Sequence, residues 1–348
     1  MYDLTEREKT ILRYIIHQFI LTANPVGSRN IFKKYEVGLS PASIRNIMAD
    51  LEESGFLGHP HTSAGRIPTD KGYRFYVDSL MEPPRLDKQE KDFIDSEFES
   101  AGSNADELLK ITSFVLSNLT NQLACVTYPN FSNAILERLQ IVTLSSTRIM
   151  VVLSIKSGMV NTITLEIKTE VKPEQIQTVE RLLNERLSGL KLSEIKNTLS
   201  ERIKDYFADE YKPIIRVFID SADKIFMDSP SNDKSIITGA KNILKQPEFG
   251  IYEHFQSIIE LMEDKDVIIH IMDERKTINP EEVTILIGSE TENDRFGDYS
   301  IITREYKVGR VSGRLGIVGP KRMEYSKAVA AVVYVAETLS KELKKISA

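Results

Sequence analysis

Small, polar and basic side chains between residues 40 and 54 could make direct contacts with duplex DNA. Helical periodicity predicts a helix here, because Ile44, Met48 and Leu51 recur on one side of it. The opposite face carries Ala42, Ser43, Arg45, Asn46, Ala49 and Asp50. Arginine matches two acceptors of guanine and asparagine matches the edge of adenine, so this face can read bases in the major groove. Ser40, with the free amides that follow it, could hold a phosphate at the helix start.

A polar loop, residues 59–66 (HPHTSAGR), follows the predicted helix and ends in a cation. Such a loop can lie along the phosphate backbone or place Arg66 in a narrow minor groove, where negative potential is concentrated. The candidate DNA contacts in and after the loop are His61, Thr62, Arg66, Thr69, Lys71, Tyr73 and Arg74. The candidate contacts in the helix are Ser40, Ala42, Ser43, Arg45 and Asn46. Two histidines without a third ligand make a weak metal site, so we expect no metal here.

Three helices are needed to position these side chains, and their starts are marked by capping residues. Thr5 and Glu8 form a capping box, in which each side chain satisfies a backbone amide at the start of the first helix. Ser28 can cap a second, short helix. Ser40 can cap the third, with Pro41 in its first position, where the missing amide costs nothing.

A hairpin follows the third helix. Gly55 is suited to the left-handed residue that ends the helix, and residues 56–57 and 66–68 flank the polar loop as two short strands would. Three helices and then a hairpin is the order of the winged helix-turn-helix. We therefore predict a winged-helix DNA-binding domain over residues 1–82, which ends at a proline-containing linker over residues 82–84.

Beyond the linker, strand and helix patterns alternate, which predicts an α+β multidomain protein. Hydrophobicity alternates over residues 139–141, 149–155 and 163–167, as in an antiparallel meander. Strand patterns return after residue 283, and a final helix is predicted over residues 323–345. Strands on both sides of a long, mainly helical stretch indicate an inserted module.

Composition narrows the class of protein. The residues are 41% hydrophobic and 28% charged, as in globular proteins, and the net charge of −6 argues against indiscriminate binding of polyanions. The single cysteine, Cys125, excludes an internal disulfide framework and a cysteine-based zinc cluster. The longest apolar stretch, residues 328–336, is far shorter than the ~20 residues that a membrane helix needs. With no signal-like leader, we expect a cytoplasmic protein that does not contact membranes.

Motifs for catalysis are missing from the sequence. There is no GxSxG elbow, no HExxH and no paired arrangement of cysteine and histidine. The glycines at 309, 313, 316 and 319 lack the strand–loop–helix context and the Lys-Ser/Thr ending of a P-loop. We therefore expect no enzymatic activity and no cofactor.

Several segments resemble the HrcA family of heat-inducible transcription repressors. The first two are residues 39–46 (LSPASIRN) and 48–52 (MADLE). A longer match covers residues 61–78 (HTSAGRIPTDKGYRFYVD). The likeness continues near the other end, in residues 313–320 (GRLGIVGP) and 322–325 (RMEY), so it spans most of the chain.

The resemblance implies three domains. These are the winged helix (1–82), a GAF-like α/β domain with an antiparallel sheet (83–192 and 276–348) and an inserted, mainly helical dimerising domain (193–275). It also implies a homodimer that represses heat-shock chaperone operons by binding double-stranded DNA at an inverted repeat called CIRCE, with its active form promoted by the GroEL chaperonin. Ile47 stands where the family more often has aspartate, which leaves the base contacts less defined than the fold.

Two other functions are compatible with the sequence. The GAF-like domain could bind an effector, which would make the protein a small-molecule-responsive winged-helix repressor. Alternatively, the winged helix could contact protein instead of DNA in a structural dimer. Thermal-shift screening of metabolites tests the first alternative, and a gel shift on an inverted-repeat probe tests the second.

Overall fold

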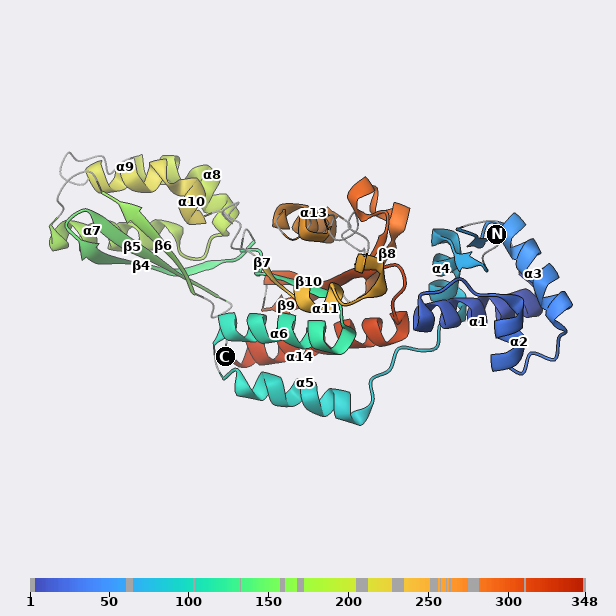
Figure 1. Cartoon of the computed structure of the whole chain (residues 1–348). Helices are drawn as coiled ribbons and strands as arrows, with labels where there is room; N and C mark the ends of the chain where they lie inside the picture. Colours follow the sequence, from blue (N-terminus) through green and yellow to red (C-terminus); the bar gives the residue numbers. More distant parts are fainter. Residues whose placement is uncertain are drawn as a thin grey trace.

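The computed structural model describes residues 4–346 apart from 61–64, 103, 132, 157–159, 168–171, 205–211, 227–234, 251–255, 257, 261, 263, 275–281 and 310. Figure 1 shows three units in a row. An N-terminal unit lies at one end, a central unit with a five-stranded sheet lies in the middle, and a unit with a three-stranded sheet lies at the other end. Every strand pair among the described residues is antiparallel, so the fold is α+β, as predicted.

The N-terminal unit consists of three helices, a short hairpin and a fourth helix. Its elements are α1 (Glu6–Thr22), α2 (Ser28–Lys34), α3 (Pro41–Glu53), β1 (Leu57–Gly58), β2 (Ile67–Pro68), α4 (Asp70–Phe75) and the π-helix η1 (Tyr76–Leu80). The predicted capping box of Thr5 and Glu8 is confirmed. The prediction that Ser28 caps α2 was wrong by one residue, because Gly27 is the N-cap and Ser28 is already helical.

The helices of this unit share one apolar core. Ile15 of α1 and Ile44 and Leu51 of α3 are fully buried in it, as the helical periodicity predicted. Gly55 follows α3 with φ +77°, the left-handed conformation predicted at this position. At Gly72 a Cβ atom would lie 2.2 Å from the carbonyl oxygen of Phe56, so α4 packs directly on the backbone that leads into β1.

The central unit is a five-stranded antiparallel sheet with the order β7-β3-β10-β9-β8. Its strands are β3 (Leu123–Thr127), β7 (Ser235–Thr238), β8 (Thr284–Ile287), β9 (Tyr299–Val308) and β10 (Val311–Pro320). The helices against one face are α6 (Ala105–Thr120) and α14 (Tyr325–Ile346), with α5 (Lys88–Ser100) outside them (Figure 1). Smaller elements are α11 (Ala240–Ile243), α13 (Lys265–Glu274) and the 3₁₀ helices η3 (Pro247–Gly250), η4 (Gly288–Thr291) and η5 (Asp294–Phe296).

Both faces of the central sheet are buried. Ala124 and Val126 of β3 belong to the cluster shared with α6 and α14, whereas the alternate residues Leu123 and Cys125 belong to a second cluster that contains Ile268 of α13. Successive side chains of a strand point to opposite faces, so β3 is apolar from Leu123 to Val126 and buried at every position, including the polar Thr127 at its end.

The third unit lies between β3 and β7 in the sequence, and we call it the inserted unit. It contains the meander β4 (Leu136–Ser145), β5 (Arg148–Ile155) and β6 (Val160–Glu166), followed by α7 (Pro173–Leu187), α8 (Leu192–Ile203), α9 (Lys212–Asp220) and α10 (Ala222–Phe226). The predicted meander is confirmed, with Ile149, Val151 and Leu153 buried on one face. Its predicted turn at Gly158 lies outside the described residues.

The strand pairing gives the inserted unit other bounds than the expected residues 193 and 275. Strands β4–β6 form their own sheet and do not pair with the central strands, so the insertion begins after Thr127 and ends before Ser235. The segment with α11 and α13 packs against the central sheet. Alternating hydrophobicity shows that a strand has one buried face, but it does not show which sheet the strand joins. Among the described helices none combines the length and the apolar character that a membrane crossing requires.

Candidate nucleic-acid interface

Helix α3 presents an exposed polar face on the N-terminal unit. Ala42, Arg45 and Asn46 are exposed, whereas Ile44 and Leu51 on the opposite side are fully buried. The side chains of Arg45 and Asn46 make no hydrogen bond and no ion pair with the part of the protein that the structure describes. Two polar side chains without internal partners, held on a packed helix, are available to bind a ligand with donor and acceptor groups.

The start of α3 is fixed by its cap. Ser40 Oγ accepts a hydrogen bond from the amide of Ser43 at 3.1 Å, and the two hydroxyl groups lie 2.9 Å apart. Pro41 occupies the first turn, as predicted. The hydroxyl of Ser43 is thus held against the cap and is half-buried, while Ala42 beside it is exposed.

Arg66 is bound to α3. Its Nη2 lies 2.6 Å from Glu52 Oε2, and the same carboxylate also contacts His59 through Oε1. The Arg66 backbone exchanges two hydrogen bonds with Val26, at 2.8 and 2.9 Å. A Cβ at Gly65 would lie 2.6 Å from the Val26 backbone, so only glycine allows this approach. The predicted contacts His61 and Thr62 lie outside the described residues.

Two further predicted contacts hold the hairpin against the end of α3. Thr69 caps α4 by accepting a hydrogen bond from the amide of Gly72, and its hydroxyl donates to the carbonyl oxygen of Gly55 at 2.7 Å. Lys71 Nζ donates to the carbonyl oxygen of Ser54 at 2.7 Å and lies 4.4 Å from the ring centroid of Phe56. Both side chains therefore fix the geometry between α3 and α4.

The last two predicted contacts, Tyr73 and Arg74, face the central unit. Tyr73 is 2% exposed and packs against Tyr325 of α14, with 6.0 Å between the ring centroids. Burial raises the pKa of its hydroxyl. Arg74 is bound by Glu290 and Asp78. The sequence led us to expect both side chains at the DNA, and their placement against the central unit corrects that expectation. Their partners Tyr325 and Glu290 are more than two hundred residues away in the sequence, so the local pattern could not predict them.

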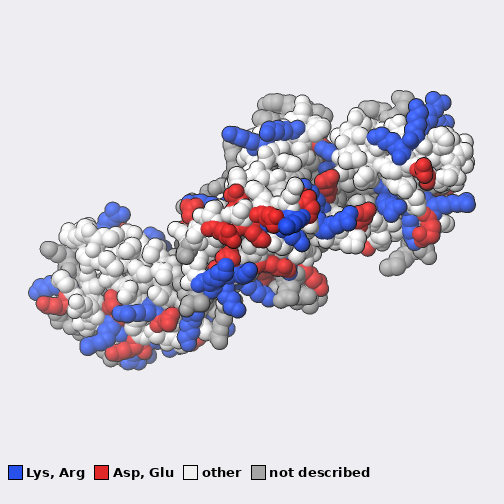
Figure 2. All heavy atoms as spheres, turned by 90° about the horizontal axis from the view of Figure 1, so that it is seen from below, with Lys and Arg blue, Asp and Glu red and all other residues white. Residues whose placement is uncertain are grey.

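Cations on α2 were not among the contacts expected from sequence. Arg29, Lys33 and Lys34 are exposed on the helix that precedes α3. In a helix-turn-helix the first helix crosses the phosphate backbone. The cluster of cations on this short helix could therefore have been used to predict phosphate contacts from the sequence. Figure 2 shows basic side chains projecting from the outer end of the N-terminal unit with a few acidic ones among them, and acidic and basic side chains mixed over the central unit.

Comparisons with known proteins agree on one family. Residues 106–329 match the family model described as "HrcA protein C terminal domain". The sequence is 42% identical over 350 residues to a heat-inducible transcription repressor HrcA of Chlorobium phaeobacteroides (strain BS1), and the match covers 98% of this chain and 99% of that protein. A protein of the same name from Prosthecochloris aestuarii is 44% identical over 346 residues, 97% of each chain.

One solved structure has a similar overall arrangement. It is described as a hypothetical protein at 2.2 Å resolution, and it aligns with a TM-score of 0.65 and 22% identity over 99% of this chain and 100% of that chain. At this identity the likeness shows a shared fold.

Proposed function

The chain belongs to the HrcA family of heat-inducible transcription repressors, and we propose that it represses heat-shock chaperone operons by binding an inverted-repeat operator, CIRCE, as a homodimer. The observation that carries the DNA contact is the exposed face of α3, on which Arg45 and Asn46 have no partner among the described residues. We assign the N-terminal unit as a winged helix, with α3 as its recognition helix and the β1–β2 hairpin as its wing.

In this assignment α3 enters the major groove. Arg45 and Asn46 contact base edges, and Ser40, Ala42 and Ser43 lie near the phosphates at the helix start. Arg66 lies on the wing beside the backbone but is paired with Glu52, and the cations of α2 contact phosphates. Thr69 and Lys71 support the wing through their hydrogen bonds to the end of α3.

The dimer is proposed to form through the inserted unit. Val142 of β4 and Val160 of β6 are 42% and 56% exposed on the sheet face opposite the buried one, and Leu144, at the irregular end of β4, is 51% exposed. Met150 pairs with Val142 across the strands and extends this apolar face. One winged helix reads too few base pairs for specific binding, and a two-fold partner doubles the contacts on an inverted repeat. Figure 1 has the inserted unit and the N-terminal unit at opposite ends, so pairing through this face leaves both copies of α3 accessible.

The chaperonin GroEL is proposed to promote the active form, and the protein to work in the cytoplasm. The exposed apolar sheet face supports this, because a protomer with such a face is prone to aggregate before it pairs. Heat would divert the chaperonin to other unfolded proteins and so relieve repression. Refolding with GroEL should raise the yield of DNA-binding dimer, and equal yields with and without it at working temperature would contradict this part.

Binding to an inverted-repeat duplex tests the central proposal. Fluorescence anisotropy compares the operator with a scrambled duplex at fixed salt, for the wild type and for Arg45→Ala/Asn46→Ala. We expect each base contact that the double variant removes to lower operator affinity by roughly 5- to 150-fold, with affinity for the scrambled duplex unchanged. Arg216→Ala, at an exposed arginine of α9 in the inserted unit, is the matched control and should bind as the wild type does.

A further inference from the structure

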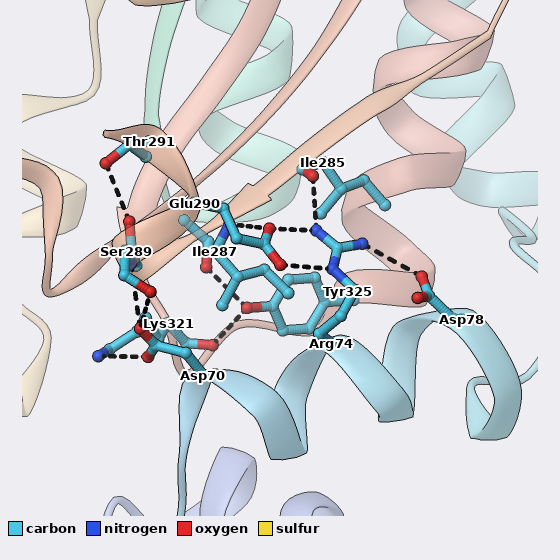
Figure 3. A network of polar contacts seen from close by, with 12 residues as sticks. Asp70, Arg74, Asp78, Ile285, Ile287, Ser289, Glu290, Thr291, Lys321 and Tyr325 are labelled. Atoms are coloured by element: carbon cyan, nitrogen blue, oxygen red, sulfur yellow. Dashed lines mark hydrogen bonds and ion pairs between the residues drawn. The ribbon is translucent and has the colours of Figure 1, made fainter. Parts of the chain in front are cut away.

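The N-terminal unit is attached to the central unit by a polar network between α4 and the turn η4 (Figure 3). Asp70 Oδ1 accepts a hydrogen bond from Lys321 Nζ at 2.7 Å. Asp70 Oδ2 accepts one from the amide of Ser289 at 3.0 Å and one from its hydroxyl at 3.2 Å. One carboxylate of α4 is thus held by two segments of the central unit.

Arg74 makes a second set of contacts one turn further along α4. Its Nε and Nη2 donate to the two carboxylate oxygens of Glu290, at 2.8 and 2.5 Å. Nη2 also donates to the carbonyl oxygen of Ile285 at 2.7 Å, and Nη1 donates to Asp78 at 3.1 Å. Arg74 and Glu290 side chains are each 29% exposed, and two-point binding of this kind fixes direction as well as distance.

The surroundings of the network are shaped to receive α4. Gly288 has φ +53°, and a Cβ there would lie 2.3 Å from Asp70 Oδ2, so a larger residue would displace the carboxylate. Tyr73, which lies between Asp70 and Arg74 in the sequence, is buried against Tyr325. Residues 70, 73 and 74 have the spacing of one helix face, so a single face of α4 makes the whole contact.

Helix α4 is also joined by hydrogen bonds to the C-terminal end of α3. Lys71 donates to the carbonyl oxygen of Ser54 and Thr69 donates to that of Gly55, directly after α3 ends. A rotation of α4 on the central unit would therefore carry α3 with it. Arg322 adds a hydrogen bond to the carbonyl oxygen of Ile20, and the linker after η1 is the covalent connection between the units.

We propose that Asp70 and Arg74, with Ser289, Glu290 and Lys321, are positioning residues for operator binding: they fix the angle and spacing of the two recognition helices in the dimer. This inference rests on the proposed function. A rigid contact between the units holds the two N-terminal units of the dimer at one separation. A loose contact allows many separations, which lowers the effective concentration of the second N-terminal unit at the second half-site. The network therefore acts on full-operator affinity and on the preference for one spacer length, and leaves half-site affinity alone.

Charge exchange at the Arg74–Glu290 pair tests this role. The variants are Arg74→Glu, Glu290→Arg and the double exchange, with Glu290→Gln as a milder change that keeps the shape of the side chain. Each is titrated with a half-site duplex, with the full inverted repeat, and with repeats whose spacer is lengthened or shortened. Arg202→Glu, at the partly exposed Arg202–Glu194 ion pair of α8, is the matched control.

We expect the single variants to bind the half-site as the wild type does, to bind the full repeat roughly 10- to 100-fold more weakly, and to discriminate less between spacers. The double exchange should recover part of the affinity, because it restores the opposite-charge pair with residue 290 but leaves Asp78 and the carbonyl oxygen of Ile285 without their donor. If a charge-reversal variant fails to fold, Glu290→Gln is expected to show the same split with a smaller decrease.

Three results would overturn the inference: equal decreases on half-site and full repeat, no decrease on either, or no recovery in the double exchange. A wild-type protein that does not prefer the inverted repeat to a scrambled duplex would instead contradict the proposed function itself. The two failures are therefore distinguishable.

Discussion

The guanidinium of Arg66 and the carboxylate of Glu52 form an ion pair across the wing and the end of α3, with 2.6 Å between Nη2 and Oε2. The other oxygen of the same carboxylate contacts His59. A single acidic residue of α3 thus neutralises the cation that ends the wing loop and fixes the wing against the helix. The positive charge of Arg66 on the wing is therefore already paired with Glu52 before any ligand binds.

Glu52→Gln should raise the affinity for duplex DNA of any sequence by roughly 3- to 10-fold at low salt, because it removes a negative charge and releases Arg66. The slope of log K against log salt should become steeper by about one. Anisotropy titrations at several salt concentrations measure both. Glu53→Gln removes the same charge at an exposed neighbour that makes no ion pair with the described residues. Identical behaviour of the two variants would show that the pair with Arg66 has no role.

The cations of α2 should contribute to affinity without contributing to specificity. Lys33→Ala/Lys34→Ala is expected to weaken binding to operator and scrambled duplex alike, and to reduce the salt slope by about one for each phosphate that is no longer neutralised. Arg45→Ala should instead change the ratio of the two affinities. A decrease confined to the operator in the lysine variant would argue against phosphate binding by α2.

The contact of Asp70 should make stability depend on pH. Burial alone would raise the pKa of Asp70, but hydrogen bonds from Lys321 and Ser289 outweigh it and lower the pKa below its usual value of about 3.9. The contribution of the charged carboxylate is therefore present above that value and is lost as the pH falls through the lowered pKa. Asp70→Asn should cost about 1–3 kcal/mol of unfolding free energy at pH 7.

The measurement is urea unfolding of Asp70→Asn and wild type at neutral and acidic pH. The difference between them should shrink once the pH is below the folded-state pKa. Asp50→Asn, at an exposed acid of α3, should show no comparable difference at either pH. If the difference in unfolding free energy between Asp70→Asn and wild type does not change with pH, the charge of Asp70 is not its cause.

Gly65→Ala should displace the wing. The added Cβ would lie 2.6 Å from backbone atoms of Val26, which cannot move aside as a side-chain end can. We expect the variant to be less stable by about 1–3 kcal/mol and to have a lower melting temperature. Gly58→Ala, where the added Cβ would meet only Thr69 Cγ2 at 3.7 Å, an ordinary van der Waals contact, is the control in the same hairpin and should change the melting temperature little.

Charges on the outer face of the inserted unit should separate the protomers. Val142→Lys/Leu144→Glu places two charged groups in the proposed dimer interface, where their desolvation is unfavourable. Sedimentation should show a monomer that retains its secondary structure. Phe114→Glu changes a similarly exposed side chain of α6, which is 47% exposed, and should remain a dimer. A dimeric Val142→Lys/Leu144→Glu variant would place the interface elsewhere.

Local chemistry in the sequence determined the elements that carry the candidate site. The capping box at Thr5, the cap at Ser40 and the left-handed Gly55 depend on neighbours within a few residues, so α1 and α3 could be predicted with their buried and exposed faces. Only the tertiary structure decided the roles of Tyr73 and Arg74 and the separation of the β4–β6 meander from the central sheet. Arg74 and Glu290 are 216 residues apart, and periodicity reports which face of a segment is buried without naming what buries it.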